Sequence, residues 1–273
     1  MQMSSRNPPI TRLLRALSWI EVFVLAGASV LLLVLPSEAR AQWPWPLTPF
    51  NAMFMGVIYA SALIAVANMA RVGRWAPARP VLVFIFTFTL VVFVVSLLYV
   101  NRFDFQKWLT WAWFALYFIL PVNSAYHLWL YRKRPPAEAA PVASTWRIVL
   151  LAMSAALGAY GLGLLLAPAL FGGFWPWALD AFHGQLYSAT FLAGAAGLYA
   201  VSRVAARVER ETVALAQVSF SAFAILGLIL VDASVHRVDW SLPGTWLWIG
   251  ALGWGVIVGA AMLMSARRMS VAR

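Results

Sequence analysis

The chain carries the sequence PVLVFIFTFTLVVFVVSLLYV at residues 80–100, and this run contains no charged side chain. A helix needs about 20 predominantly apolar residues to cross the hydrocarbon core of a bilayer. The run is therefore long and apolar enough to span a membrane as one helix. It decides the fold class of the whole chain, because similar runs recur on both sides of it.

The overall composition predicts the same class. The 273 residues are 63% hydrophobic and 11% charged, and the mean hydropathy is +0.81. Soluble chains are about 25% charged, so a water-soluble fold is excluded, and the many aromatic and branched side chains exclude disorder. The chain has no cysteine, which excludes disulfide frameworks and thiolate metal sites. We expect an all-α integral membrane protein in contact with the lipid bilayer.

Eight apolar segments predict eight transmembrane helices, separated by short connections rich in Pro, Gly, Asp and Arg. The segments are 15–35, 50–70, 80–100, 108–131, 146–166, 181–201, 212–232 and 245–265. The longest connection, 132–145, contains several prolines and a glutamate. We expect it to be a flexible cytoplasmic linker.

Basic residues set the expected orientation. With the N-terminus in the cytoplasm, 16 of the 20 Lys and Arg residues fall in cytoplasmic segments and 4 on the opposite, outer face, in line with the positive-inside rule. Both termini are then cytoplasmic. The net charge of +11 is explained by basic residues that face anionic lipid, so no nucleic-acid partner is expected. The cytoplasmic set is Arg6, Arg12, Arg15, Arg71, Arg74, Arg79, Arg132, Lys133, Arg134, Arg147, Arg203, Arg207, Arg210, Arg267, Arg268 and Arg273.

The two halves of the chain share sequence motifs. WPWPLTPFN at 43–51 matches WPWALDAFH at 175–183 with an offset of 132, and 5 of these 9 positions are identical. NRFDF at 101–105 matches HRVDW at 236–240, and TWAW at 110–113 matches TWLW at 245–248, both with an offset of 135. We therefore expect two parallel four-helix repeats, 1–131 and 146–273. Four helices per repeat keep both repeats in the same orientation, as in parallel-repeat transporters.

The block Trp43-Pro44-Trp45-Pro46-Leu47-Thr48-Pro49 resembles a WPWxLTP-type motif of uncharacterised bacterial multi-pass membrane proteins. The likeness covers this block and the four-helix unit around it, and the second copy lacks counterparts of Pro46, Thr48 and Pro49. The resemblance implies a bacterial cytoplasmic (inner) membrane and no particular activity.

Tryptophans and polar residues gather at the predicted outer ends of the helices. The tryptophans are Trp43, Trp45, Trp108, Trp111, Trp113, Trp175, Trp177, Trp240, Trp246 and Trp248, and they predict an aromatic belt at the membrane interface or, alternatively, rings that stack on a ligand. The symmetric polar residues are Asn51, Asn101, Arg102, Asp104, Arg237 and Asp239. The repeated Arg-x-Asp triplet predicts a local ion pair in each turn, or a site for an anion or headgroup.

Four further residues of metal-ligand type lie at the outer ends of two successive helices. Asp180 and His183 are three residues apart, and Asp232 and His236 are four apart, so each pair shares a helical face. Two imidazoles and two carboxylates would suit a divalent metal, namely zinc, iron or manganese. The alternatives are solvated interfacial polarity, pairing with Arg237, a proton relay or ligand binding.

Glu21 is the one acidic residue deep inside a predicted span. An ionisable group at that depth is costly and marks a functional site by default. Its expected neighbours are Asn68, Asn123, His127 and Gln217. The alternative is a neutral glutamic acid that is hydrogen-bonded to another helix or extends toward Arg15.

Three classes of function remain open from the sequence. The favoured class is a non-catalytic protein that binds a small ligand or lipid, or serves as an accessory subunit with membrane-protein partners. The second is a transporter or channel that uses Glu21. The third is an outer-face metal-dependent membrane enzyme that uses Asp180, His183, Asp232 and His236. The chain has no Walker, G-x-S-x-G or dinucleotide motif, so it offers no local sign of catalysis.

Overall fold

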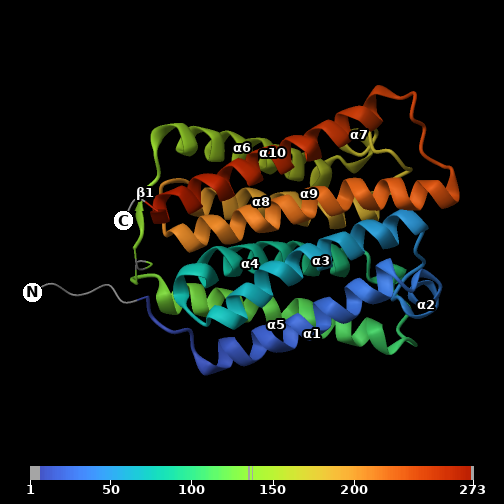
Figure 1. Ribbon diagram of the computed structural model, residues 1–273. Coiled ribbons are helices and arrows are strands. Elements are labelled where there is room, and N and C mark those ends of the chain that lie inside the picture. The colour runs from blue at the N-terminus through green and yellow to red at the C-terminus, as the bar shows by residue number, and fades with distance from the viewer. Residues whose placement is uncertain (1–6, 135, 137, 272–273) are drawn as a thin grey trace, which may run out of the picture.

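The computed structural model describes residues 7–134, 136 and 138–271, which form ten α-helices and two short strands (Figure 1). Four basic residues of the predicted cytoplasmic set are not fully described. Arg6 and Arg273 lie outside the described residues, as do the side chains of Arg267 and Arg268. The helices are α1 (Arg12–Leu33), α2 (Pro36–Gln42), α3 (Pro49–Val72), α4 (Trp75–Leu98), α5 (Trp108–Tyr131), α6 (Ser144–Leu166), α7 (Pro168–Phe171), α8 (Ala181–Ser202), α9 (Arg207–Val235) and α10 (Pro243–Val271). A 3-10 turn, η1, covers Val100–Arg102, and the strands are β1 (Ala140–Pro141) and β2 (Val204–Ala205).

Each of the eight predicted segments corresponds to a helix of at least 22 residues. Six helices of the described chain, α1, α3, α4, α6, α9 and α10, are long and apolar enough to cross a membrane. The other two long helices, α5 and α8, interrupt their apolar runs with Trp, Tyr, His, Gln and Ser side chains. The protein is thus an all-α membrane protein. The prediction missed α2 and α7, because helices of 7 and 4 residues leave little periodicity to recognise.

Side-chain caps begin the helices that follow the two Trp-Pro-Trp blocks. Thr48 Oγ1 accepts a hydrogen bond from Asn51 N at 3.3 Å at the start of α3, and Asp180 Oδ1 accepts one from His183 N at 2.8 Å at the start of α8. Such caps satisfy backbone N–H groups that have no partner within a helix. The two helices therefore start at matched positions of the aligned halves.

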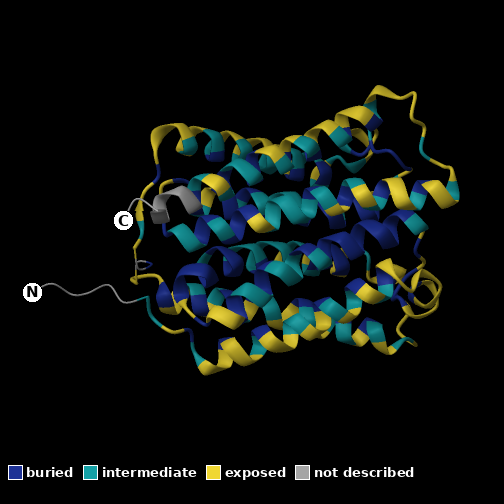
Figure 2. Ribbon diagram, in the orientation of Figure 1, coloured by how far each residue is buried: buried dark blue, intermediate teal, exposed yellow. Residues whose placement is uncertain are grey.

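The long helices pack as two groups (Figure 1). α1 packs against α3 and α4 against α5 in the first half, while α6 packs against α8 and α9 against α10 in the second. The halves meet where α3 contacts α9 and α4 contacts α8. Figure 2 shows the buried residues concentrated along this central layer and the exposed ones on the outer helices. Because the outer helices expose large apolar side chains such as Phe23 on α1 and Ile257 on α10, they contact lipid.

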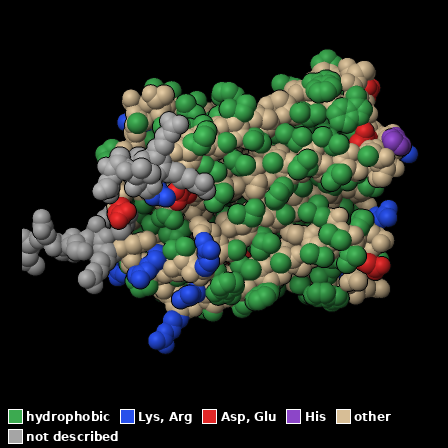
Figure 3. Space-filling model, viewed as in Figure 1, with side chains coloured by type: hydrophobic (Ala, Val, Ile, Leu, Met, Phe, Trp, Pro, Cys, Tyr) green, Lys and Arg blue, Asp and Glu red, His purple; other side chains and the backbone are tan. Residues whose placement is uncertain are grey.

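The two ends of the bundle differ in charge. The basic end contains the start of α1, the turn between α3 and α4, and strands β1 and β2; the tryptophan end contains α2, α7 and the residues 43–48 and 172–180 that follow them (Figure 1). On the face seen in Figure 3, most Lys and Arg side chains lie near the basic end. The uneven distribution of charge expected from the sequence is therefore visible on this face.

The predicted linker 132–145 is partly held in place. Ala140 pairs with Ala205 and Pro141 with Val204 in an antiparallel ladder, and Val142 N donates to Arg203 O at 3.0 Å. Val142 is also buried. The expectation of a flexible linker is wrong for residues 140–142, because they find hydrogen-bond partners in the connection between α8 and α9.

Candidate functional site

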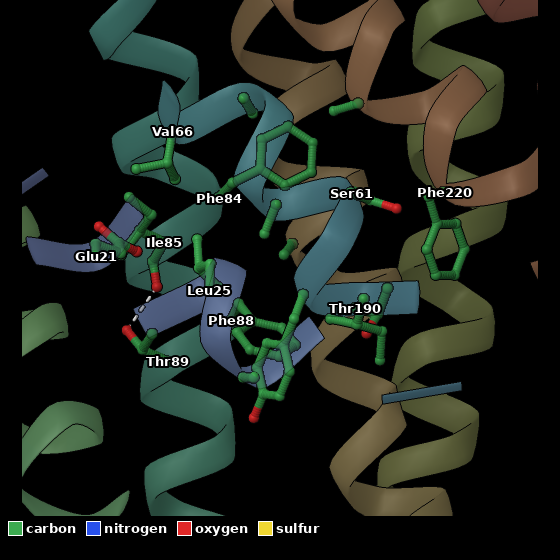
Figure 4. A pocket seen from close by; sticks show the side chains of 18 of the residues that line it. Glu21, Leu25, Ser61, Val66, Phe84, Ile85, Phe88, Thr89, Thr190 and Phe220 are labelled. Carbon is green, nitrogen blue, oxygen red and sulfur yellow. Dashed lines mark hydrogen bonds between the residues drawn. The ribbon is translucent and has the colours of Figure 1, made fainter. Parts of the chain in front are cut away.

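A cavity of about 870 Å³ lies inside the bundle, and residues from all eight long helices line it. This volume is typical of small-molecule sites, which measure about 300–1,000 Å³. Its walls are mainly aliphatic and aromatic, with Leu25, Ile85 and Phe220 among the side chains drawn in Figure 4. The cavity can therefore accommodate a molecule that is mostly apolar.

The cavity reaches the lipid-facing surface between α1 and α5. Phe23 on α1 and Trp108 on α5 both line it, and they are 73% and 67% exposed. A second cavity of about 300 Å³, lined by residues such as Leu17 and Val122, follows the same seam between α1 and α5. Two cavities therefore lie along the seam between α1 and α5 and are lined in part by exposed apolar side chains.

Glu21 faces the main cavity from α1 (Figure 4). It lies nine residues after the first residue of α1, about 14 Å along the helix axis. Glu21 makes no hydrogen bond or ion pair with a residue that the structure describes. Its carboxyl group is thus available to a molecule in the cavity.

The expected partners of Glu21 are engaged elsewhere or share its cavity. Asn68 Nδ2 donates to Thr212 Oγ1 at 3.0 Å. His127 contacts Thr11 Oγ1 at 2.8 Å and the carbonyl oxygen of Asn123 at 2.9 Å. Gln217 lines the same cavity as Glu21.

Other polar groups line the cavity wall. The Tyr59 and Tyr117 hydroxyls lie 3.1 Å apart and share a hydrogen bond. Trp43 Nε1 and Thr190 Oγ1 are buried and have no hydrogen-bond partner among the described residues. A buried polar atom without a partner usually costs about 1–3 kcal/mol, so these groups are candidates to bind a ligand.

The three ionisable groups of the cavity wall, all on the first half, have apolar counterparts on the second. At the offset of 132, Glu21 matches Met153 and Tyr59 matches Phe191; at the offset of 135, Tyr117 matches Leu252. All three counterparts line the same cavity. Among the described residues, the ionisable groups of the cavity wall therefore all lie on α1, α3 and α5. Sequence reasoning missed Tyr59 and Tyr117, although their replacement by Phe and Leu in the other half could have revealed them.

The predicted aromatic belt is largely a buried cluster. Six of the ten tryptophans expected to anchor the protein are buried: Trp43, Trp45, Trp113, Trp175, Trp177 and Trp248. Trp45 and Trp113 pack edge to face with centroids 4.8 Å apart, and Trp175 and Trp177 do the same at 4.8 Å. Interfacial anchoring is wrong for these six, because their rings fill the space between the helices. Trp108, Trp111, Trp240 and Trp246 are exposed.

Two hydrogen bonds connect the halves within this cluster. Trp45 Nε1 donates to His183 Nε2 at 3.1 Å, and Trp177 Nε1 donates to Asn51 Oδ1 at 3.2 Å. Because His183 Nε2 accepts, its Nδ1 carries the proton and donates to Asp180 Oδ1 at 2.8 Å. This hydrogen bond, with Arg102 3.7 Å from the other carboxylate oxygen, lowers the pKa of Asp180 to about 2.

The four predicted metal ligands do not converge. Asp232 accepts hydrogen bonds from Arg237 N at 2.9 Å, Val238 N at 2.8 Å and Trp240 Nε1 at 2.8 Å, so its carboxylate closes the C-terminal end of α9. His236 caps that helix in the left-handed conformation, with φ of 50°. Among the described residues, no three His, Asp or Glu side chains are placed to hold a metal ion. The expected zinc, iron or manganese site is therefore corrected to an Asp180–His183 pair and a separate helix end.

The Arg-x-Asp triplets also differ from expectation. Asp104 Oδ1 accepts from Gln106 N at 3.0 Å, and Asp239 Oδ1 accepts from Ser241 N at 2.9 Å. Arg102 lies near Asp180 instead of Asp104, and the described ion pairs do not include Arg237 with Asp239. The predicted local ion pairs are wrong, since each aspartate holds its turn through a backbone amide. Asn101 is exposed in η1.

Comparison of the chain with protein-family models, curated proteins and solved structures finds no match. The resemblance carried by the Trp43–Pro49 block therefore stays a prediction.

Proposed function

We propose that the protein binds a lipid-like or other small apolar molecule from the bilayer in its main cavity, without acting on it chemically. The observation that carries this proposal is the cavity of about 870 Å³ with its apolar walls and its opening between α1 and α5. Burial of apolar ligand surface supplies about 25 cal/mol per Å². A ligand-binding role is favoured over that of an accessory subunit because an accessory role needs no such cavity.

The proposed topology has eight spans, both termini in the cytoplasm, and two parallel four-helix repeats at 1–131 and 146–273, in a bacterial inner membrane. The long α5 and α8 are counted as spans because they lie beside helices that are apolar enough to cross. In the aligned halves α3 corresponds to α8 and α4 to α9. The contacts of α3 with α9 and of α4 with α8 are therefore equivalent, which supports the repeats. The basic end is assigned to the cytoplasm by the positive-inside rule.

A transporter that uses Glu21 is the second candidate. The observation in its favour is the carboxyl group that faces a cavity about halfway along a spanning helix, a position typical of coupling sites. A transporter must also bind its substrate before moving it. The first experiment therefore measures ligand binding. An outer-face metal enzyme is not proposed, because Asp180, His183, Asp232 and His236 do not converge.

The experiment is native mass spectrometry of the protein released from lipid nanodiscs, with Ala112→Phe and Ala115→Phe as matched variants. Ala112 lines the cavity on α5, while Ala115 is exposed on the same helix and does not line it. We expect a retained apolar adduct in the wild type and in Ala115→Phe, and its loss in Ala112→Phe, where the new ring fills the cavity. Equal retention in all three proteins would place the adduct outside the cavity and overturn the proposal.

A further inference from the structure

We propose that the ligand of this cavity is a lipophilic cation: an apolar molecule with one positive charge that pairs with the Glu21 carboxylate. The inference rests on the proposed function, because it names the chemical class of ligand for the same cavity.

The described residues that line the cavity hold no countercharge for Glu21. An ionised carboxylate inside a bilayer is costly unless it is paired. Glu21 has no partner among the described residues, and the described residues that line the cavity include no Lys, Arg or His. A proton or a bound cation must therefore neutralise Glu21, and the cavity offers room for the cation.

Aromatic rings line the cavity together with Glu21. Tyr59 and Tyr117 share a hydrogen bond in the cavity wall, and the centroids of the Trp113 and Tyr117 rings lie 4.3 Å apart. The face of an aromatic ring attracts a cation within about 6 Å. These rings add to the attraction of the carboxylate and provide apolar surface for the body of the ligand.

The second half of the chain provides an internal comparison. Met153, Phe191 and Leu252 occupy the positions that match Glu21, Tyr59 and Tyr117. The matched positions of the second half are therefore filled by apolar residues, so the fold of a repeat does not itself require polar groups there. Glu21, Tyr59 and Tyr117 on the first half are best explained as groups that recognise a charged ligand.

Pairing of a cation with the Glu21 carboxylate determines how ligand binding depends on pH. Glu21 on α1, Tyr59 on α3 and Tyr117 on α5 are the titratable groups among the described residues that line the cavity; those lining it from α4, α6, α8, α9 and α10 are uncharged and do not titrate. A proton and a cation compete for the same carboxylate. Cation binding should therefore weaken as the pH falls, and binding should release a proton wherever Glu21 is protonated in the free protein.

The test measures equilibrium binding of three probes of similar shape in detergent: tetraphenylphosphonium, neutral tetraphenylmethane and anionic tetraphenylborate. The variants are Glu21→Gln and, as a matched control, Glu38→Gln on α2, where the carboxylate is exposed and outside the cavity. We expect the wild type and Glu38→Gln to bind the cation at least about tenfold more tightly than the anion. The net charge of +11 would favour the opposite order, so a preference for the cation cannot come from overall charge.

Glu21→Gln should lose about tenfold or more of its affinity for the cation and its pH dependence, while it keeps its affinity for the neutral probe. Retained neutral binding shows that the variant is folded and its cavity intact. If the wild type binds the neutral probe as tightly as the cation, and Glu21→Gln binds both with the same affinities, the inference is overturned and the proposed function stands. Failure of all three probes to bind the wild type would contradict both.

Discussion

Trp45 Nε1 donates a hydrogen bond to His183 Nε2 at 3.1 Å, and this bond joins the first half of the chain to the second. The reciprocal bond joins Trp177 to Asn51 at 3.2 Å. Trp45 matches Trp177 and Asn51 matches His183 at the offset of 132. Each half therefore supplies a tryptophan donor to the matched acceptor of the other, which is the pattern that a two-fold relation generates.

The first prediction concerns this pair. Trp45→Phe keeps an aromatic ring but removes the donor to His183, so a buried nitrogen is left without a partner. We expect a loss of about 1–3 kcal/mol in the free energy of unfolding, measured by graded SDS unfolding. Trp111→Phe is the control, because Trp111 is 63% exposed and donates only to Phe105 O. Losses of equal size in the two variants would show that the Trp45 bond has no special role between the halves.

The second prediction concerns the ion pair between the halves at the basic end. Arg79 Nε lies 2.5 Å from Glu209 Oε1, and the Glu209 side chain is fully buried. Glu209→Leu leaves Arg79 without its countercharge and should cost about 3–5 kcal/mol in unfolding free energy. Glu211→Leu should cost about 0.5 kcal/mol or less, since Glu211 pairs one turn away with Arg207, which is 42% exposed.

The loss in Glu209→Leu has two possible origins: the unpaired charge left on Arg79, and the loss of the ion pair itself. A double variant separates them. Replacing a buried ion pair with apolar residues is often neutral, so Arg79→Leu together with Glu209→Leu should regain most of the stability lost in Glu209→Leu. If the double variant is no more stable than Glu209→Leu, the unpaired charge on Arg79 is not the cause of the loss.

The third prediction concerns acid. The pKa of Asp180 is lowered from 3.8 to about 2 in the folded protein, chiefly by the hydrogen bond from His183. Because the folded pKa is the lower one, the Asp180 carboxylate stabilises the fold above about pH 4, and this contribution is lost as the pH falls toward 2. Asp180→Asn keeps a capping side chain but should flatten the fall in melting temperature between these pH values. An unchanged acid profile would contradict the assigned role of Asp180.

Much of the fold could be predicted from the sequence, because membrane spans are long and apolar. All eight predicted segments are helical, and α5 occupies the predicted residues 108–131. The short α2 and α7 were missed because helices of 7 and 4 residues show little periodicity. The β1–β2 ladder was missed because it joins residues far apart in the chain.

The site was predicted less well. Spacing on a helix identifies which side chains share a face, but it does not show which helix ends meet. Asp180 and His183 do interact, as their spacing suggested, whereas Asp232 is used by the turn that follows α9. Glu21 was recognised from the cost of a charge in a bilayer. Its cavity was not, because cavities arise from packing among all the helices.

The most direct test of ligand binding in the cavity is photolabelling with a neutral long-chain alcohol that carries a diazirine, mapped by peptide mass spectrometry in nanodiscs. A neutral probe tests occupancy of the cavity independently of the charge on Glu21. Binding in the cavity predicts labels at residues that line it on α1 and α5, such as Leu25 and Leu116, and their loss in Ala112→Phe but not in Ala115→Phe. Labels confined to the lipid-facing surface, and equal in both variants, would contradict it.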